Sequence, residues 1–354
     1  MDITHQKYLE KKFFENLDGI RALSIIAVIW HHSAAHLGKY NLNLLQQGNH
    51  GVTLFFVLSG YLITTLLLRE KKRTSTINLK NFYARRTLRI FPLYYFVILF
   101  LYVPAVYFFE SNPARQSDFW NNLPYFLTYT GNIFATSTTT SMIFLFSWSL
   151  AIEEQFYIVW PTIEKYLSSK YTMILTLIII AVLTIFNTHI SEMNHFNGVI
   201  IRLISVPILM GVISAHLLNN KKAYNIIHRV LGNKYSFLIS AFSLLISLEL
   251  NRDTSFAIYF FATTMVVSSV INSNFWGKNL MQSKVLVEIG KVSYGIYLYH
   301  VLTINMIKKI ASYFELHNGV IIFISSCVVS YIISYLSFNL FEIKFIKMKK
   351  NFSS

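Results

Sequence analysis

Charged residues are scarce in this sequence: they make up 13% of its 354 residues, whereas apolar residues make up 54%. An average soluble domain carries roughly 25% charged residues, so the charges here are too few to cover the surface of an ordinary soluble enzyme. Aromatic residues reach 16%, which excludes the class of disordered chains, because those are polar and poor in aromatics. The composition therefore predicts a folded protein that is embedded in a membrane.

Cysteine, glycine and proline are also few. The single cysteine, Cys327, excludes an internal disulfide and a cysteine-based metal cluster, and its apolar surroundings indicate a packing residue. No stretch is rich enough in glycine, proline or serine to form a linker, and no internal repeat is visible. We therefore predict one membrane-embedded domain over residues 1–345, followed by a short basic tail at 346–354.

Long apolar runs recur along the whole chain. About 20 apolar residues cross a bilayer as a helix, and the sequence contains ten candidates. The predicted spans are residues 19–37, 50–68, 90–109, 141–164, 171–189, 198–218, 235–250, 254–272, 289–308 and 318–342. The fold class predicted from this pattern is an all-α integral membrane protein with about ten transmembrane helices.

Acidic residues are outnumbered by basic ones, 16 to 31, which gives a formal net charge of +15. The basic residues concentrate before the first span, between the second and third spans, and in the tail, while alternate loops are nearly bare; Lys308 and Lys309 depart from this pattern. Cytoplasmic loops carry such an excess, so both termini are predicted to be cytoplasmic. A nucleic-acid partner is excluded because the charge follows the topology and does not gather on one face.

The first span carries two ionisable groups on one helical face. A charged residue inside a span costs roughly 2.5–3.5 kcal/mol on insertion scales, so each one is a functional candidate. Arg21 and His32 are eleven residues apart, which places them on one face about 16 Å apart along the axis, while His31 points about 80° away. A snorkelling arginine and an interfacial histidine are the alternative. His32 and His36 have a spacing that can hold zinc, but no third ligand accompanies them, and we predict no metal.

Small residues open the second span, and an arginine pair precedes the third. Gly48, Gly51 and Gly60 allow close backbone approach. Helix packing is the alternative role of the small pair Ser59 and Gly60. Ser59 lacks an evident base that would make it a nucleophile. Arg86 and Arg89 are three apart and share a face. Two guanidinium groups there can clamp a phosphate, although a lipid-headgroup anchor is the alternative.

Two further polar groups lie in later spans. Glu153 and Glu154 sit inside an apolar segment and point about 100° apart, so at most one lines a given cavity; ion pairing with Arg21 or Arg86 is the alternative role. Tyr294, Tyr297 and His300 step by three and form a polar stripe.

Taken together, these segments resemble the acyltransferase family 3 of integral membrane O-acyltransferases, from about residue 14 to 345. The similar elements are Arg21 to His32, the block 48–62, Arg86 and Arg89 followed by Pro92 and Tyr94, the block WSLAIEEQFY at 148–157 with Glu153 as its glutamate, and SYGIYLYH at 293–300. One departure is that Ile343 and Lys344 follow Glu342, where family members often have Arg-Pro.

The resemblance implies transfer of an acyl group, usually acetyl from acetyl-CoA, to a hydroxyl of a cell-surface polysaccharide or lipid-linked glycan. Acetyl-CoA or another acyl-CoA would be the donor substrate, with no bound cofactor, and the protein would be a multi-pass protein of the bacterial inner membrane. The expected catalytic residues are His32 as general base, because a neutral imidazole can take a hydroxyl proton, together with Arg21 and Glu153. Arg86 and Arg89 are expected to bind the acyl-CoA. The expected lining of a substrate channel is Gly48, His50, Gly51, Ser59, Tyr94, Trp148, Ser149, Gln155, Tyr157, Tyr294, Tyr297 and His300.

Two other functions are compatible with a many-span chain that has internal polar groups. A transporter or flippase of a lipid-linked sugar or polysaccharide predicts internal repeats, which are not found. A non-catalytic partner in a glycan-assembly complex is the weaker alternative. Some relatives carry an additional hydrolase-like domain outside the membrane that completes the transfer. None follows residue 345 here, so we expect that such a relay would need another protein.

Overall fold

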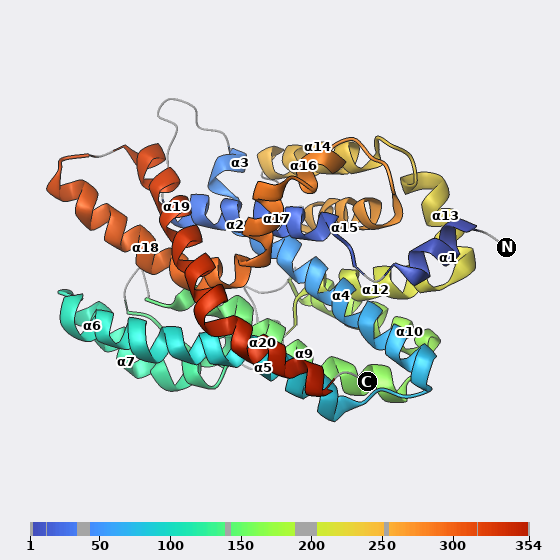
Figure 1. Ribbon diagram of the computed structural model, residues 1–354, viewed down its shortest axis with the longest axis horizontal. Coiled ribbons are helices and arrows are strands. Elements are labelled where there is room, and N and C mark those ends of the chain that lie inside the picture. Colours follow the sequence, from blue (N-terminus) through green and yellow to red (C-terminus); the bar gives the residue numbers. More distant parts are fainter. Residues whose placement is uncertain are drawn as a thin grey trace. The chain divides into compact units, whose positions relative to one another are not determined.

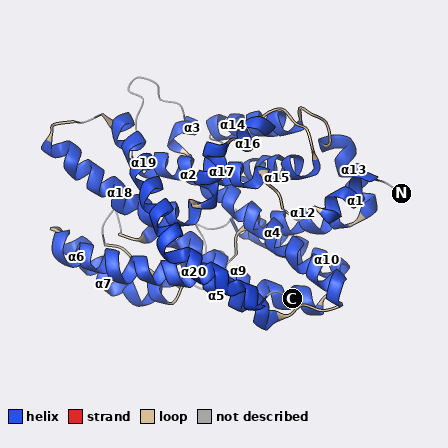
Figure 2. Ribbon diagram, viewed as in Figure 1, coloured by secondary structure: helices blue, strands red, loops and turns tan. Residues whose placement is uncertain are grey.

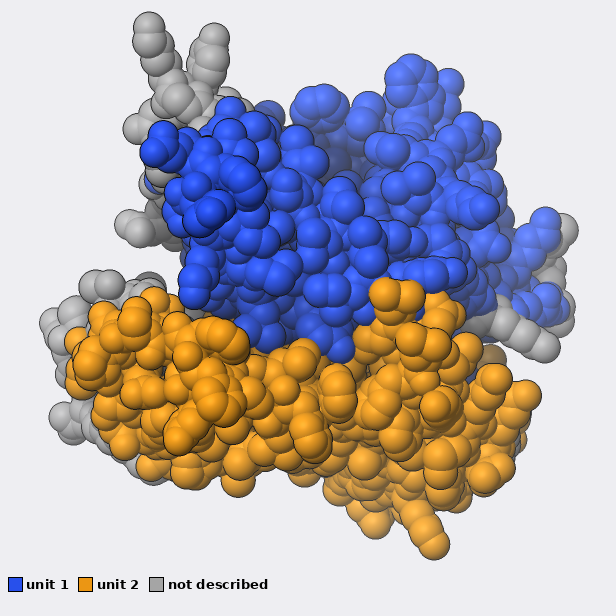
Figure 3. Space-filling model, turned by 60° about the vertical axis from the view of Figure 1, so that its left-hand side comes forward, with its two compact units in different colours: residues 1–69, 206–335 blue, residues 70–205, 336–354 orange. Residues whose placement is uncertain are grey.

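The computed structural model describes residues 3–11, 13–33, 43–138, 143–187, 204–250, 255–316 and 318–352. All regular structure in these ranges is helical and contains no strand (Figure 2), which confirms the all-α prediction for this part of the chain. The chain groups into two compact units, residues 1–69 with 206–335 and residues 70–205 with 336–354 (Figure 3). Our assignment of residues 1–345 to one domain and 346–354 to a tail stays a prediction.

The first unit is built around one helix near the N-terminus. Its helices are α1 (Ile3–Glu10), α2 (Asn16–Ser33), α3 (Asn43–Gln46), most of α4 (Gly51–Thr74), α12 (Val206–Asn219), α13 (Lys221–Leu231), α14 (Ser236–Leu250), α15 (Ser255–Ile271), α16 (Lys278–Met281), α17 (Lys284–Lys291), α18 (Ser293–Tyr313) and most of α19 (Gly319–Ser337) (Figure 1). Helix α2 packs against α15, α16, α17, α18 and the 3-10 turn Gly48–His50. Most of its residues are buried, including the polar Asn16, Asp18 and Ser24.

Glycines set how closely these helices approach one another. A Cβ atom at Gly60 would lie 1.9 Å from the carbonyl oxygen of Ile208, so α4 and α12 cross with their backbones in contact. A Cβ at Gly48 or Gly51 would lie 2.3 or 2.4 Å from a carbonyl oxygen of α2. The predicted close backbone approach at Gly48 and Gly51 is therefore confirmed, and the residues after Gln47 are held directly against α2.

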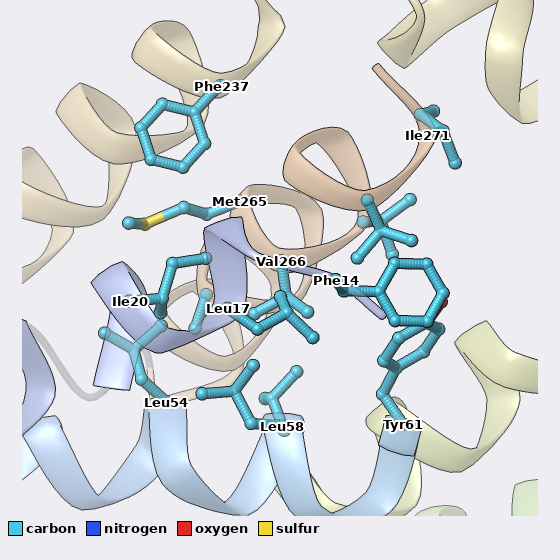
Figure 4. Close-up of a cluster of buried hydrophobic side chains, with 14 of the residues drawn as sticks. Phe14, Leu17, Ile20, Leu54, Leu58, Tyr61, Phe237, Met265, Val266 and Ile271 are labelled. Carbon is cyan, nitrogen blue, oxygen red and sulfur yellow. The ribbon is translucent and has the colours of Figure 1, made fainter. Parts of the chain in front are cut away.

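An apolar cluster joins α2 to α4, α14 and α15. Leu17 and Ile20 of α2 meet Leu54 and Leu58 of α4, with Met265 of α15 on the other side (Figure 4). Lipid is as apolar as these side chains, so tight packing stabilises helix contacts inside a bilayer. The cluster fixes the rotation of α2 about its axis, and with it the direction of each polar side chain on that helix.

The second unit contains the arginine-rich segment and the predicted fourth span. Its helices are α5 (Leu79–Val97), which continues through the π-helical turn Ile98–Tyr102 into α6 (Val103–Phe109), then α7 (Pro113–Leu127), α8 (Gly131–Phe134), α9 (Trp148–Tyr166), α10 (Ser169–Asn187), the π-helical turn Phe338–Glu342, α20 (Ile343–Met348) and the 3-10 turn Lys349–Phe352. Asn112 caps α7 by accepting hydrogen bonds from the backbone of Ala114 and Arg115, and Pro113 occupies the first position, as helix starts favour. The connection between the predicted spans 90–109 and 141–164 therefore contains a helix.

Within the described ranges, three helices are long and apolar enough to cross a membrane: Gly48–Thr74, Leu79–Phe109 and Gly319–Phe352. The bent pair α13 and α14 could add a fourth, and α10, α12 and α15 are shorter apolar helices. Helix α14 exposes Ile239, Phe242 and Ile246 on one face, which suits a surface that meets lipid. The length and apolar composition of these helices therefore identify the chain as a membrane protein. Ten spans and cytoplasmic termini stay predictions, and residues 34–42 and 188–203 of the expected spans and their connections lie outside the described residues.

Candidate active site

His32 lies near the end of α2, and its hydrogen bonding fixes its protonation pattern. Its Nδ1 atom is 2.9 Å from the backbone oxygen of Val28, one turn earlier. A carbonyl oxygen can only accept a hydrogen bond, so Nδ1 is the donor and carries the hydrogen of the neutral ring. The lone pair of the neutral imidazole is therefore on Nε2, and no described residue hydrogen-bonds to that atom. This is the form that a general base requires.

A second histidine packs against His32. The rings of His32 and His300 have centroids 4.8 Å apart and meet edge to face at 74°. His300 is fully buried on α18 and its Nδ1 donates to the backbone oxygen of Tyr297 at 2.6 Å, while the Tyr297 ring lies 5.4 Å from the His300 ring. Phe55 of α4 borders Tyr297. Three of the predicted residues, His32, Tyr297 and His300, are thus brought together from helices far apart in the sequence.

His31 and His50 lie beside this group without joining it closely. His31 is exposed, and its Nδ1 donates to the backbone oxygen of Gln46 at 3.1 Å. His50 is half-buried and its Nδ1 is 3.3 Å from the hydroxyl of Thr53. The expectation that His31 points away from the site face is consistent with its exposure. Among the described residues no group of three His, Cys, Asp or Glu could hold a metal; His36 lies outside the described residues.

Arg21 is separated from His32 and has its own partner. Helix α2 runs unbroken from Asn16 to Ser33, so the two side chains start about 16 Å apart along its axis. The guanidinium group pairs with the buried carboxylate of Asp18 on the same helix. Arg21 is therefore held by Asp18 at a point of the helix well separated from His32. The sequence analysis missed Asp18, although its spacing of three from Arg21 was a signal.

Arg86 of α5 lies in an aromatic and acidic setting in the second unit. Its guanidinium carbon is 5.0 Å from the centre of the Tyr157 ring and 5.8 Å from that of Phe82, and it lies within electrostatic range of Glu154. Glu154 is buried, whereas Glu153, the glutamate that the motif favours, is half-buried. Of this pair, Glu154 is the glutamate found within electrostatic range of Arg86, and ion pairing with Arg86 stays the alternative role.

The other two arginines of this segment have different surroundings. Arg85 pairs with Glu70 at 3.3 Å and donates to the backbone oxygen of Phe352 at 2.6 Å. Arg89 is exposed and lies within electrostatic range of Glu342 and Lys349. Neither Glu70 nor Lys349 was singled out from the sequence, because only the fold brings residues so far apart in the chain together.

Several predicted channel residues form hydrogen bonds within the second unit. Tyr94 donates from its hydroxyl to the backbone oxygen of Phe126 at 2.7 Å. Gln155 exchanges two amide hydrogen bonds with Asn132 and also donates to the backbone of Tyr129. The remaining predicted residues differ in burial: Ser149 and Tyr157 are buried, Ser59 and Tyr294 are half-buried, and Trp148 is exposed.

The fold and these groups define a class: an all-helical membrane protein with an imidazole pair in one unit and an arginine cluster in the other. Residues 14–338 match the family described as the acyltransferase domain. The chain belongs to this acyltransferase family.

Two similar proteins carry a name that specifies the transfer. The O-acetyltransferases OatA of Staphylococcus aureus strains NCTC 8325 / PS 47 and COL are each 29% identical over 331 residues, which cover 85% of this chain and 53% of each relative. The chain thus spans about half the length of these curated relatives. No solved structure matches the chain.

Proposed function

We propose that this protein transfers an acetyl group from acetyl-CoA to a hydroxyl of a cell-surface polysaccharide or lipid-linked glycan. The observation that carries the proposal is the state of His32. Its Nδ1 hydrogen is held by the Val28 carbonyl, and its Nε2 lone pair has no described partner. A neutral imidazole held in one tautomer suits removal of a proton from a sugar hydroxyl.

The proposed reaction is written for the simpler route, direct transfer; transfer through a covalent acyl intermediate is the alternative. Nε2 of His32 takes the proton as the acceptor oxygen attacks the thioester carbon, and the carbon–oxygen bond forms. The tetrahedral intermediate then collapses, the carbon–sulfur bond breaks, and the thiolate of CoA leaves. The imidazolium returns its proton to that thiolate, so the products are the acetyl ester and free CoA, and His32 is neutral again. His300 supports this role by packing against the His32 ring, which limits its rotation.

The donor is proposed to bind through Arg86 and Arg89. Acyl-CoA carries several phosphate charges, and a guanidinium group binds phosphate through two parallel hydrogen bonds. Arg85 is a weaker candidate because Glu70 and the Phe352 carbonyl already engage it. We assign the donor to this segment because its arginines are predicted to lie on the cytoplasmic side of the membrane, where a charged cytosolic thioester would arrive.

The acceptor is proposed from the names of the relatives and from the family resemblance. OatA is named an O-acetyltransferase, so an oxygen nucleophile is the expected acceptor. Glu153 and Arg21 stay candidates for catalysis, although the pairing of Arg21 with Asp18 favours a role in holding α2.

Release of CoA by the purified protein tests the proposal. The full chain, reconstituted in lipid, is supplied with acetyl-CoA and with candidate glycans or lipid-linked sugars, and both free CoA and acetylated product are measured. The proposal expects CoA release that depends on the acceptor. Movement of a glycan across the bilayer without any acetyl transfer would show that the protein is a transporter or flippase instead.

A further inference from the structure

Four cationic side chains gather where the C-terminal segment packs on α5. Helix α20 and the 3-10 turn Lys349–Phe352 both contact α5, and the half-buried ammonium group of Lys349 lies within electrostatic range of Arg85, Arg86 and Arg89. Like charges at such range repel one another, and partial burial weakens the screening by water. A negatively charged group nearby would stabilise such a cluster of positive charges.

Carboxylates lie near the arginines, but none is paired with the lysine. Glu70 pairs with Arg85, while Glu342 lies within electrostatic range of Arg89. Lys349 has no carboxylate partner among the described residues; the charged groups that face it are the three arginines. One positive charge therefore remains without compensation in a partly enclosed place.

The position of Lys349 is fixed by contacts that do not involve its own side chain. The guanidinium group of Arg85 donates to the backbone oxygen of Phe352 at 2.6 Å. The ring of Phe341 lies 5.0 Å from that of Phe96 on α5 and 5.1 Å from that of Phe345 on α20. The segment is thus attached to α5 at both of its ends, and it lies beyond residue 338, where the family match stops.

We propose that Lys349 is a donor-binding residue, which joins Arg86 and Arg89 in holding the phosphate groups of acyl-CoA. This inference rests on the proposed function. The donor offers a pyrophosphate and a separate phosphate on its ribose, so a fork from arginine and a point charge from lysine can serve different groups. The C-terminal segment, which looks like a basic tail in the sequence, thereby becomes part of the donor site.

Binding of CoA to the full chain tests this role. The wild type, Lys349→Met, Lys349→Arg and Lys347→Met are compared in nanodiscs of phosphatidylcholine alone, which contain no anionic lipid. Lys347 is exposed on the same segment, so its variant is the matched control for the loss of one charge. Loss of a charge-assisted contact should weaken CoA binding about tenfold or more in Lys349→Met, whereas Lys347→Met and Lys349→Arg should stay within about threefold of wild type.

The unfolding temperature without CoA separates binding from a structural role. Lys349→Met should keep or raise it, because a repelling charge is removed, and should lose part of the stabilisation that added CoA gives. A lower unfolding temperature with unchanged CoA affinity would overturn the inference.

Two further outcomes have distinct meanings. If Lys349→Met matches wild type in phosphatidylcholine and differs only when phosphatidylglycerol is added, the anion at Lys349 is a lipid headgroup and the inference fails. If the wild type itself binds no CoA, the proposed function fails as well.

Discussion

Replacement of His32 by asparagine tests the roles of its two ring nitrogens separately. Nδ1 donates to the Val28 carbonyl at 2.9 Å, and Nε2 holds the lone pair. The amide nitrogen of asparagine occupies nearly the place of Nδ1 and can keep that hydrogen bond, while nothing replaces Nε2. The retained bond is worth about 1 kcal/mol to the fold, so His32→Asn should insert and fold like the wild type while lacking only the base.

The expected loss of turnover is large. A general base contributes about 10²–10⁴-fold to the rate, and His32→Asn should lose that factor. The neighbour His31 is the control, because it is exposed and bonded to the Gln46 carbonyl. The fold-change in turnover caused by His31→Asn should be less than about a tenth of the fold-change caused by His32→Asn.

Acetyl transfer is measured at equal membrane levels between about pH 5 and pH 8, the range in which histidine titrates. Wild-type turnover should rise with pH to a plateau, because only the neutral ring accepts a proton, and the residual activity of His32→Asn should lose this rise. A His32→Asn enzyme as active as wild type would leave His32 as a packing residue. A larger loss in His31→Asn would show that the other face of α2 lines the site.

Three further outcomes test the fold. Gly60→Ala should lower stability by about 1–3 kcal/mol in thermal unfolding, because its Cβ would lie 1.9 Å from the backbone of α12, whereas Gly131→Ala meets only a ring atom at 3.1 Å and should cost less; equal losses would contradict the backbone contact. Asp18→Asn should cost about 1–3 kcal/mol, less than loss of a fully buried pair because the arginine partner is 23% exposed, and an unchanged midpoint would remove the stabilising role of the pair. A cysteine placed by Ser75→Cys in a Cys327→Ala background should react only with reagent on the cytoplasmic side; labelling of intact cells from outside would reverse the topology.

Spacing along a single helix could be predicted from the sequence. The eleven-residue separation of Arg21 and His32 was interpreted as one helical face, and α2 is an unbroken helix over both residues. The helix period is a local property, so no knowledge of neighbouring elements was needed. The partner of Arg21 was harder to identify, because Asp18 on the same helix competes with every carboxylate elsewhere in the chain.

Contacts between distant segments could not be read in this way. The polar stripe of Tyr297 and His300 was visible, but its packing against His32 depends on how α18 crosses α2. The assignment of residues 346–354 as a basic tail stays a prediction; the contact between Arg85 of α5 and the backbone oxygen of Phe352 joins residues 267 positions apart and depends on the fold alone. Helix α7 lies between two predicted spans and is too short and polar to read as an apolar run that crosses a bilayer, although Asn112 and Pro113 form an ordinary helix start.

The hydrogen bonding of a buried polar group is a sharper criterion for a functional residue than its membership of a family motif. Both oxygens of the buried Asp118 accept hydrogen bonds, from Ser137 and from the backbone and hydroxyl of Thr138, so this carboxylate holds a loop and has little capacity left for a substrate. Both ends of the Gln155 amide are occupied in the same way, although it lies in a family motif. His32 differs, because one ring nitrogen is fixed by the backbone and the other is left with a lone pair. An unused acceptor in a partly buried place costs stability, and a fold keeps such a group where a reacting hydroxyl supplies the missing hydrogen.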